Sequence, residues 1–411
     1  MHVMVVNNAY PPFAVGGAEL IVSYLSEGLA RRGHRVTVVS TCGPDMEPYP
    51  VEIRNGVEVI RFFPPNLYWS FRPGRQSTIR KWAWHARDSW NRSAGRRLGV
   101  ILATTRPDAF HTHLIDGFSA TIWERMRRTG RPIVHTAHDY HLLCPRAFLM
   151  TPDWRVCSRP QIHCRLYRSW HLNTTRLIDL FVSPSRFLLD KHERAGMPAA
   201  RSMVIHNGIP LPEDMDRVRQ RRPPGSRRRF LMLSRLTVEK GVRVVLDAVA
   251  RLPVGLDIEV AIGGTGPLEQ EVRAAATHDR RIVYLGFVNG EAKSMALSRA
   301  GYLLLPSLWH ENAPVTIIEA AAYGLGMIAS NMGGIPEFVE ANATGMLLPP
   351  GDVSALARLM ERLTQDEDTL PDLSERSLHL AQRFSVDRMV DAYETQYAEL
   401  AELSPSLAVA E

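Results

Sequence analysis

The segment Pro306–Gly324, PSLWHENAPVTIIEAAAYG, decides the fold of the second half of the chain. The apolar run Leu303 to Leu305 before it has the composition of a buried parallel strand, which Pro306 ends. Within the segment, Pro314 suits the first turn of a helix, because an N–H group there has no acceptor inside the helix. Strand, loop and helix in this order predict one βα unit of a parallel sheet.

Two carboxylates flank the start of this helix. Glu311 lies on the loop, and Glu319 follows about two turns along the helix at 1.5 Å per residue. The helix N-terminus between them directs backbone N–H groups toward an anion. The residues of this turn are Asn312, Ala313, Pro314 and Val315. A carboxylate for sugar hydroxyls, another for a ribose and a helix end for phosphate together suggest a sugar-nucleotide site.

A second stretch points to the same chemistry. The apolar run LMLSRL, Leu231–Leu236, leads into TVEKG, so that Arg235 and Lys240 lie between a strand end and a helix start. Ligands bind at that edge of an open α/β sheet. Arginine is a planar fork and lysine a point charge, and both suit a diphosphate leaving group. Each alone is typical of a solvated surface, but together with the two carboxylates they favour a diphosphate site.

Length and alternating pattern predict an α/β protein with parallel sheets. A chain of 411 residues is too long for one ordinary core and suggests two domains. In the first half we expect strands at Val3–Asn7, Val36–Ser40, Val57–Phe62, Ala109–His113, Ile133–Ala137 and Leu180–Ser183. A helix from Gly17 has an apolar face of Leu20, Ile21, Tyr24, Leu25 and Leu29. We place the domains at residues 1–205 and 230–385, a Pro- and Arg-rich linker at 206–229, and a last helix at 386–411.

Several short motifs resemble the retaining glycosyltransferases of family 4. SRLTVEKG and SLWHENAPVTIIEAAAYG are the specific pieces. The weaker ones are GGAE (Gly16–Glu19), FHTH (Phe110–His113), AHDYHLLCP (Ala137–Pro145), VIHNGI (Val204–Ile209), IGGTGP (Ile262–Pro267), and GGIPEFV with TGMLLPPGD near 333–352. Many relatives have an aromatic residue and glycine after the first glutamate, where this chain has Asn312 and Ala313.

The resemblance implies a GT-B fold, in which two Rossmann-like domains face each other across a deep cleft. The first domain would bind the acceptor, the second the nucleotide sugar, and the last helix would cross back to the first domain. The implied activity is transfer of a hexose, with retention, from a nucleotide diphosphate sugar to a hydroxyl of a glycan, lipid-linked or small-molecule acceptor. No metal or other cofactor is required, because two basic residues take the role that Mg²⁺ has elsewhere.

The resemblance also implies roles for single residues. Arg235 and Lys240 would neutralise the diphosphate, Glu319 would bind the ribose, and Glu311 would hold the donor sugar beside the reacting carbon. His113 would lie near the reacting sugar and the acceptor. Further donor contacts fall on Gly16, Gly17 and Gly264, and the acceptor side on His138 and Asp139. The alternatives are a plain turn for Gly16-Gly17 and a hydrogen-bonded core histidine for His111, which shares a strand face with His113.

A cysteine-rich stretch offers the one candidate metal site. Cys144, Cys157 and Cys164, with His163, could form a Cys₃His zinc site that pins a long loop. No CxxC pair is present, and buried or unpaired thiols are the alternative that we favour. Four cysteines in a chain of this length do not indicate a disulfide scaffold.

The segment Arg72–Arg97 is basic, with interleaved tryptophans and a single acid, Asp88. Apolar residues at helical spacing are Ile79, Ala83, Ala86, Trp90, Ala94 and Leu98. Such a helix can lie on an anionic membrane surface. We favour the alternative, a crossover helix whose apolar stripe faces the domain core.

Composition excludes other classes. The net charge of +6 would fit a nucleic acid, but no nucleic-acid motif is present. Neither a dinucleotide fingerprint nor a P-loop is present, which argues against a dehydrogenase or kinase. No apolar run is long enough for a membrane span, and the N-terminus lacks signal-peptide features, so we expect a cytoplasmic protein, peripheral at most at the inner membrane surface. Two alternative functions remain, a sugar-nucleotide epimerase and a non-catalytic nucleotide-sugar-binding partner.

Overall fold

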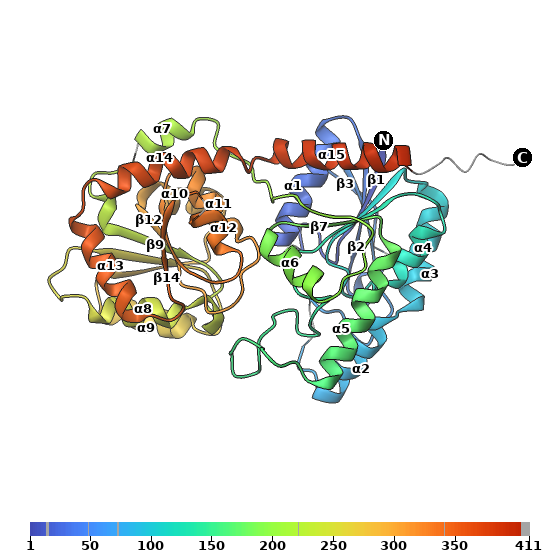
Figure 1. The fold of residues 1–411 in the computed structure, drawn as a ribbon, viewed down its shortest axis with the longest axis horizontal. Coiled ribbons are helices and arrows are strands. Elements are labelled where there is room, and N and C mark those ends of the chain that lie inside the picture. Colours follow the sequence, from blue (N-terminus) through green and yellow to red (C-terminus); the bar gives the residue numbers. More distant parts are fainter. Residues whose placement is uncertain (14–15, 48, 72–73, 221, 341, 404–411) are drawn as a thin grey trace, which may run out of the picture. The chain divides into compact units, whose positions relative to one another are not determined.

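The computed structural model describes residues 1–13, 16–47, 49–71, 74–220, 222–340 and 342–403, which form two compact units (Figure 1). The first unit contains Met1–Leu149, Ser158–Gly208 and the C-terminal segment from Val386. The second contains Met150–Cys157 and Ile209–Ser385. Each unit is built around one sheet with helices packed on it.

The first unit has an eight-stranded sheet in the order β3-β4-β2-β1-β5-β6-β7-β8. All neighbouring strands are parallel except β3 and β4, which are antiparallel. The strands are β1 (His2–Val6), β2 (Arg35–Thr41), β3 (Glu52–Arg54), β4 (Val57–Phe62), β5 (Ala109–Thr112), β6 (Ile133–Thr136), β7 (Leu180–Ser183) and β8 (Ser202–Val204). The six strands expected from the sequence are present, each within one residue of its predicted ends.

Seven α-helices lie in the described part of the first unit: α1 (Gly17–Arg31), α2 (Thr78–Ser89), α3 (Arg92–Thr105), α4 (Thr121–Arg127), α5 (Ile162–Thr174), α6 (Arg186–Arg194) and α15 (Val386–Leu403). The prediction for the face of α1 was partly wrong. Ile21, Leu25 and Leu29 are buried, but Leu20 is exposed and Val22 is buried in its place. The buried stripe follows the i, i+4 rows, and Leu20 falls at its edge.

The single helix expected across residues 79–98 is two helices. Asn91 separates α2 from α3, and its side-chain Oδ1 accepts a hydrogen bond from the Ala94 N–H at 3.2 Å. Ala94 and Leu98 on α3 are buried as expected. Ile79, Ala83 and Ala86 on α2 are exposed, so the predicted core stripe is wrong for this helix. Arg72 and Pro73, at the start of the basic segment, lie outside the described residues.

The second unit has a six-stranded parallel sheet in the order β11-β10-β9-β12-β13-β14. The strands are β9 (Arg229–Leu233), β10 (Glu259–Gly263), β11 (Ile282–Gly286), β12 (Tyr302–Leu305), β13 (Gly326–Ser330) and β14 (Gly345–Leu348). The helices are α7 (Met215–Gln220), α8 (Val242–Arg251), α9 (Glu269–His278), α10 (Gly290–Arg299), α11 (Val315–Ala322), α12 (Ile335–Val339), α13 (Val353–Gln365) and α14 (Thr369–Gln382). Four 3₁₀ turns complete the described elements: η1 (Pro44–Met46), η2 (Thr175–Leu177), η3 (Ser226–Arg228) and η4 (Val238–Lys240).

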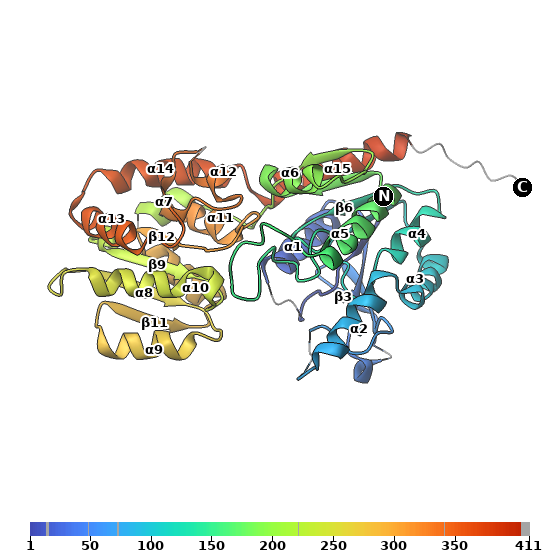
Figure 2. The ribbon, with the colours of Figure 1, turned by 60° about the horizontal axis from the view of Figure 1, so that its bottom comes forward.

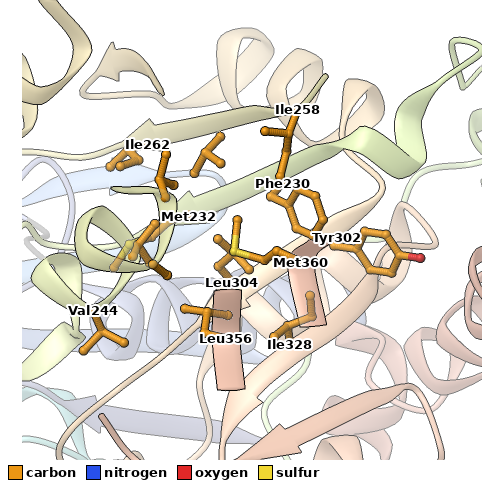
Figure 3. Packing of buried hydrophobic residues seen from close by; sticks show 14 of the residues in the cluster. Phe230, Met232, Val244, Ile258, Ile262, Tyr302, Leu304, Ile328, Leu356 and Met360 are labelled. Atoms are coloured by element: carbon orange, nitrogen blue, oxygen red, sulfur yellow. The ribbon is translucent and has the colours of Figure 1, made fainter. Parts of the chain in front are cut away.

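The core of the second unit lies between its sheet and the helices α8 and α13. Phe230, Tyr302 and Ile328 from three adjacent strands meet Val244 of α8 and Met360 of α13 (Figure 3). The Phe230 and Tyr302 rings stack with centroids 5.2 Å apart. Continuous apolar strands of this kind are typical of a parallel sheet covered by helices. The core therefore fixes the strand ends that carry the candidate site.

The chain segments around residues 206–229 and 386–403 are anchored rather than loose. The Ile209 N–H donates to the Phe384 carbonyl at 2.9 Å, and the Arg222 guanidinium donates to the Tyr323 and Gly324 carbonyls, both in the second unit. In the first unit α15 packs on α1 (Figures 1 and 2). Tyr397 of α15 lies with its hydroxyl 2.6 Å from His111 Nδ1.

Candidate active site

The second sheet changes direction beside β9. The chain builds β10 and β11 on one side of β9 and then returns to place β12 on the other side. The loops that follow β9 and β12 therefore diverge, which leaves a crevice at the carboxyl ends of these strands. Arg235 and Lys240 lie on the loop after β9, and Glu311 lies on the loop after β12. Three predicted site residues thus lie at this switch point.

Glycines allow the loops at the switch point to pack backbone against backbone. Gly241 has φ +75°, and a Cβ there would lie 1.9 Å from the Pro306 carbonyl oxygen. A Cβ on Gly264 would lie 1.8 Å from the Ser234 carbonyl oxygen. Gly264, which was expected to contact the donor, therefore has a packing role in the structure that supports the loop carrying Arg235. Both positions need glycine for space and for a positive φ.

Lys240 and Glu311 form a largely buried ion pair at the switch point. Lys240 Nζ lies 2.7 Å from Glu311 Oε1, and the Ser307 hydroxyl donates to the same oxygen at 2.7 Å. The ammonium group also lies 4.9 Å from the centroid of the Trp309 ring, within the range of a cation–π contact. Lys240 is therefore held in one place by a carboxylate and an aromatic face.

The charge of Glu311 depends on this pairing. Burial alone would raise the pKa of Glu311, but the Lys240 charge and hydrogen bonds from Lys240, Ser307 and Trp309 outweigh burial. The net effect holds the pKa below its ordinary value, so Glu311 is ionised at neutral pH. Lys240 and Ser307 both bind Oε1, so neither of them occupies Oε2, which can accept from a sugar hydroxyl.

Arg235 extends from the loop after β9 with its side chain largely exposed. Its Nη2 atom lies 3.9 Å from Oε1 of Glu239, a buried carboxylate. Glu239 Oε2 has no hydrogen-bond partner among the described residues. Sequence reasoning missed Glu239, although it lies in the TVEKG stretch between the two predicted basic residues. The Arg235 guanidinium is exposed and lies near the buried Glu239 carboxylate, so it is available to bind a diphosphate.

The helix that follows Glu311 begins one residue after Pro314, which was expected in its first turn. α11 starts at Val315, with Pro314 as its N-cap residue and no side-chain hydrogen bond to the cap. Glu319 on α11 forms an ion pair with Lys293 Nζ on α10. Sequence reasoning missed Lys293, because a lysine 26 positions away on another helix gives no local signal. Glu319 thus already has a cation beside it.

The first sheet has its own switch point, at β1 between β2 and β5. His113 follows β5 there and is buried, with Nδ1 3.0 Å from His138 Nε2. His113 Nε2 is buried without a hydrogen-bond partner among the described residues. Burial, together with His111 and His138, lowers the pKa of His113 well below its ordinary value, so the ring is neutral. The structure thus brings two predicted residues, His113 and His138, together.

His111 is the hydrogen-bonded core histidine considered in the sequence analysis. Its Nδ1 lies 2.6 Å from the Tyr397 hydroxyl, and its Nε2 lies 2.8 Å from the Thr136 hydroxyl. The His111 and His113 rings lie with centroids 4.0 Å apart, so they share one strand face as predicted. His111 links the sheet to α15 and has no free ring nitrogen for a ligand.

A partly buried charged cluster, of which sequence reasoning found only Asp139 as a site residue, surrounds the loops after β1, β5 and β6. Asp116 Oδ1 lies 2.9 Å from His141 Nδ1, and Asp116 Oδ2 accepts from the Asn8 amide at 2.7 Å. Asp139, predicted on the acceptor side, accepts from the His141 N–H at 2.8 Å. Asp88 of α2 accepts from the Gly117 N–H at 2.8 Å.

The pKa values of this cluster are displaced in ways that follow from burial and pairing. Burial alone would lower the pKa of His141, but the Asp116 carboxylate and the nearby acids raise it to about 9. Burial raises the pKa of Asp88 to about 8, and burial with the Asp116 charge raises that of Asp139 to about 7. Near neutral pH His141 is therefore an imidazolium and Asp116 a carboxylate, and Asp139 titrates in that range.

The glycines before α1 do not form an open phosphate loop. The Gly16 N–H donates to Glu19 Oε2 at 2.9 Å, so the amide predicted to bind a diphosphate already has a partner. Glu19 also places a negative charge at the N-terminus of α1, where it stabilises the helix and repels an anion. Gly17 is the first residue of α1. The donor role of Gly16 and Gly17 remains a prediction that requires Glu19 to move aside.

The cysteine-rich stretch does not form a ligand set. None of the four cysteines forms a disulfide, and among the residues that the structure describes no group of three or more His, Cys, Asp or Glu side chains is arranged to hold a metal ion. His163 instead lies edge-on to Trp82 of α2, with ring centroids 5.1 Å apart.

No described helix is both long and apolar enough to cross a membrane.

The chain has two α/β units, each built on a mainly parallel sheet. The second unit has a basic pair and a paired glutamate at its switch point. These features define a sugar-transferring enzyme of two Rossmann-like domains. Residues 214–379 match the family described as Glycosyl transferases group 1, and residues 15–212 match Glycosyltransferase Family 4. The chain belongs to this group of glycosyltransferases and has the GT-B fold.

Known proteins resemble the chain over nearly its whole length. The O-antigen chain mannosyltransferase C of Escherichia coli is 26% identical over 413 residues, covering 98% of this chain and 99% of the relative. Among solved structures, sucrose-phosphate synthase from Thermosynechococcus elongatus has a TM-score of 0.76 at 19% identity, covering 98% and 99% of the two chains. HepE of Anabaena in complex with UDP has a TM-score of 0.67 at 19% identity, covering 97% and 100%. These similarities support the GT-B fold.

Proposed function

We propose that this glycosyltransferase moves a hexose, with retention of configuration, from a nucleotide diphosphate sugar to a hydroxyl of a glycan or lipid-linked acceptor in polysaccharide biosynthesis. The observation that carries the proposal is the buried Lys240–Glu311 pair beside exposed Arg235 at the switch point of the second sheet. The mannosyltransferase relative and the UDP complex of HepE support a nucleotide sugar as donor. A cytoplasmic location is part of the proposal.

The donor diphosphate would bind between the basic pair and the start of α11. Arg235 can contact two phosphate oxygens through its planar fork, while Lys240 supplies a fixed point charge. The uncapped first turn of α11 adds backbone N–H donors. These groups gain most as charge develops on the leaving diphosphate, which is how they would lower the barrier to transfer.

The glutamates would position the donor. Glu319 would accept hydrogen bonds from the ribose hydroxyls, either beside its contact with Lys293 or in place of it. Glu311 would accept a hydrogen bond from a sugar hydroxyl through Oε2. Glu311 Oε1 is already occupied by Lys240 and Ser307, which makes the carboxylate a weak nucleophile. This pairing favours reaction on one face of the sugar, with the leaving phosphate taking the acceptor proton, over a double displacement.

The acceptor would be bound by residues of the first unit. His113 is neutral and presents a buried Nε2 that lacks a partner among the described residues, so it can exchange a hydrogen bond with an incoming hydroxyl. His138 orients His113 through the second ring nitrogen. Asp139 titrates near neutral pH and lies in the same segment, as an acceptor-side group would.

A donor screen tests the proposal. The protein is incubated with UDP- and GDP-hexoses, with and without a polyprenyl-linked or glycan acceptor, and nucleoside diphosphate release is measured. We expect acceptor-dependent release with one donor, and NMR of the product should show the anomeric configuration of the donor. Lys240→Met should abolish release, while Arg243→Ala, an exposed arginine on α8, should not. An inverted product, or release from no donor, would contradict the proposal.

A further inference from the structure

The helices α2 and α5 of the first unit lie side by side and form a joint surface. The Trp82 ring of α2 meets the His163 ring of α5 at 5.1 Å between centroids, and the Trp170 indole N–H of α5 donates to the Ser89 carbonyl at 3.3 Å. Trp82 precedes Ser89 along α2, and His163 precedes Trp170 along α5, so the two contacts show that the helices run in the same direction. We call the exposed side chains of Thr78–Ser89 and Ile162–Thr174 the α2–α5 face (Figure 1).

The α2–α5 face is unusually apolar for an exposed surface. Ile79, Ile162 and Leu166 are 83, 75 and 67% exposed, and Trp82 and Trp170 are 53 and 49% exposed. On α2 the exposed apolar positions 79, 82, 83 and 86 follow the i, i+3, i+4, i+7 spacing that normally faces a core. Single exposed apolar residues are ordinary, but a whole helical stripe turned to water indicates a surface that contacts something else.

The charge of the α2–α5 face specifies the partner. Among the described residues of the two helices the one acid is Asp88, which is buried, whereas Arg80, Lys81, Arg87 and Arg165 are exposed. The centre of a protein interface is depleted of charge, while a helix that lies on a bilayer combines lysine or arginine with tryptophan and aliphatic residues. Anionic headgroups attract such basic residues, and tryptophan prefers the headgroup level.

A groove beside α5 extends the same chemistry. It has a volume of about 640 Å³ and lies between α5 and the turn that follows α6. Arg165, Arg168 and Arg176 line it together with Leu166, Leu172 and Pro198. Arg168 donates to the Leu143 carbonyl at 3.1 Å, whereas Arg165 and Arg176 have no carboxylate partner among the described residues. Guanidinium groups over an apolar floor suit a phosphate with a hydrocarbon chain attached.

We propose that the α2–α5 face docks on the surface of an anionic phospholipid bilayer, with exposed isoleucine, leucine and tryptophan side chains among the headgroups and the arginine-lined groove holding a lipid phosphate. The face belongs to the unit proposed to bind the acceptor, so docking would bring the enzyme to a lipid-linked acceptor. The docking itself does not depend on the proposed donor chemistry.

Vesicle co-sedimentation tests the docking. The whole protein is spun with vesicles of phosphatidylcholine alone or with added phosphatidylglycerol, at low and high salt. We expect binding only to the anionic vesicles, weakened by salt because exposed charges are screened. Arg165→Glu with Arg176→Glu should reduce partition at least about tenfold, and Ile162→Ser with Leu166→Ser by a similar factor.

Matched controls come from the second unit. Arg280→Glu with Arg299→Glu makes the same charge change, and Val254→Ser with Met295→Ser removes exposed apolar side chains; both should bind vesicles as the wild type does. Nucleotide binding by calorimetry should be unchanged in all variants, which separates this proposal from the donor site. Vesicle binding that is absent at low salt, or equal in the α2–α5 variants, would overturn the proposal. The proposal would also be overturned if the free protein sedimented as a dimer and the α2–α5 variants sedimented as monomers.

Discussion

Lys240→Met is the most informative single substitution, because it removes the cation and keeps most of the side-chain volume. In the variant Glu311 is left buried with Ser307 and Trp309 as its remaining donors. Breaking a buried ion pair by removing one partner costs about 3–5 kcal/mol. For a unit of this size each kcal/mol shifts the melting temperature by about 2–4 °C, so a loss of roughly 6–20 °C is expected at pH 8.

The pH dependence of the loss identifies its cause. Lys240 holds the pKa of Glu311 below its ordinary value, so in the wild type the pair contributes stability that is present above the unfolded pKa and lost as the pH falls through the folded pKa. Without Lys240 burial raises the pKa of Glu311, and the carboxyl can take a proton. The difference between variant and wild type should therefore shrink from pH 8 to pH 5.

Differential scanning fluorimetry of four proteins measures the coupling. Glu311→Gln should cost less, about 1 kcal/mol, because the amide still accepts from Lys240 and Ser307. The double variant should be less destabilised than the sum of the single variants by about 2 kcal/mol or more. If the losses add, or if Lys240→Met melts with the wild type at both pH values, Lys240 and Glu311 are not paired in the folded protein.

Three further predictions concern other parts of the fold. Gly241→Ala should cost at least about 2 kcal/mol in urea unfolding, because its Cβ meets the Pro306 carbonyl at a positive φ, while Gly255→Ala, with open space around it, should not. His111→Phe should destabilise the first unit by about 1–3 kcal/mol, because the Tyr397 hydroxyl loses its partner and the Thr136 hydroxyl keeps only its bond to Tyr393, and it should speed proteolysis of α15; an unchanged cleavage rate would refute the anchoring role. Asp88 has a raised pKa of about 8 in the fold, so the folded protein holds a proton that the unfolded chain releases, and stability should fall as the pH rises from about 4 to 8. Asp88→Asn keeps the acceptor for Gly117 and should flatten this slope by up to about 1.4 kcal/mol per pH unit; equal slopes in the two proteins would contradict the assignment.

The strands were predictable because buried parallel strands are continuous apolar runs. Leu180–Ser183 is such a run, whereas Val57–Phe62 alternates apolar and polar residues over its first three positions; both were placed without error. The start of α11 was equally clear from Pro314. The pairing of Lys240 with Glu311 follows from the strand order, in which β9 and β12 are neighbours, and that order is not encoded in local spacing.

The acidic and histidine cluster illustrates what local patterns miss. Asp116 and His141 are 25 positions apart and meet because β5 and β6 are adjacent in the sheet. Periodicity also cannot tell a stripe that faces a core from one that faces water, since the spacing is the same. For that reason the apolar positions of α2 were placed in the core, although Ile79 is among the most exposed apolar residues of the described chain.

Calorimetric titration with UDP and GDP tests the central claim, a diphosphate site at the switch point of the second sheet, most directly. We predict that one of the two nucleotides binds the wild type, that Arg235→Ala weakens binding about 10- to 100-fold, and that Arg243→Ala has no effect. Binding of neither nucleotide, or equal binding by wild type and Arg235→Ala, would contradict the claim.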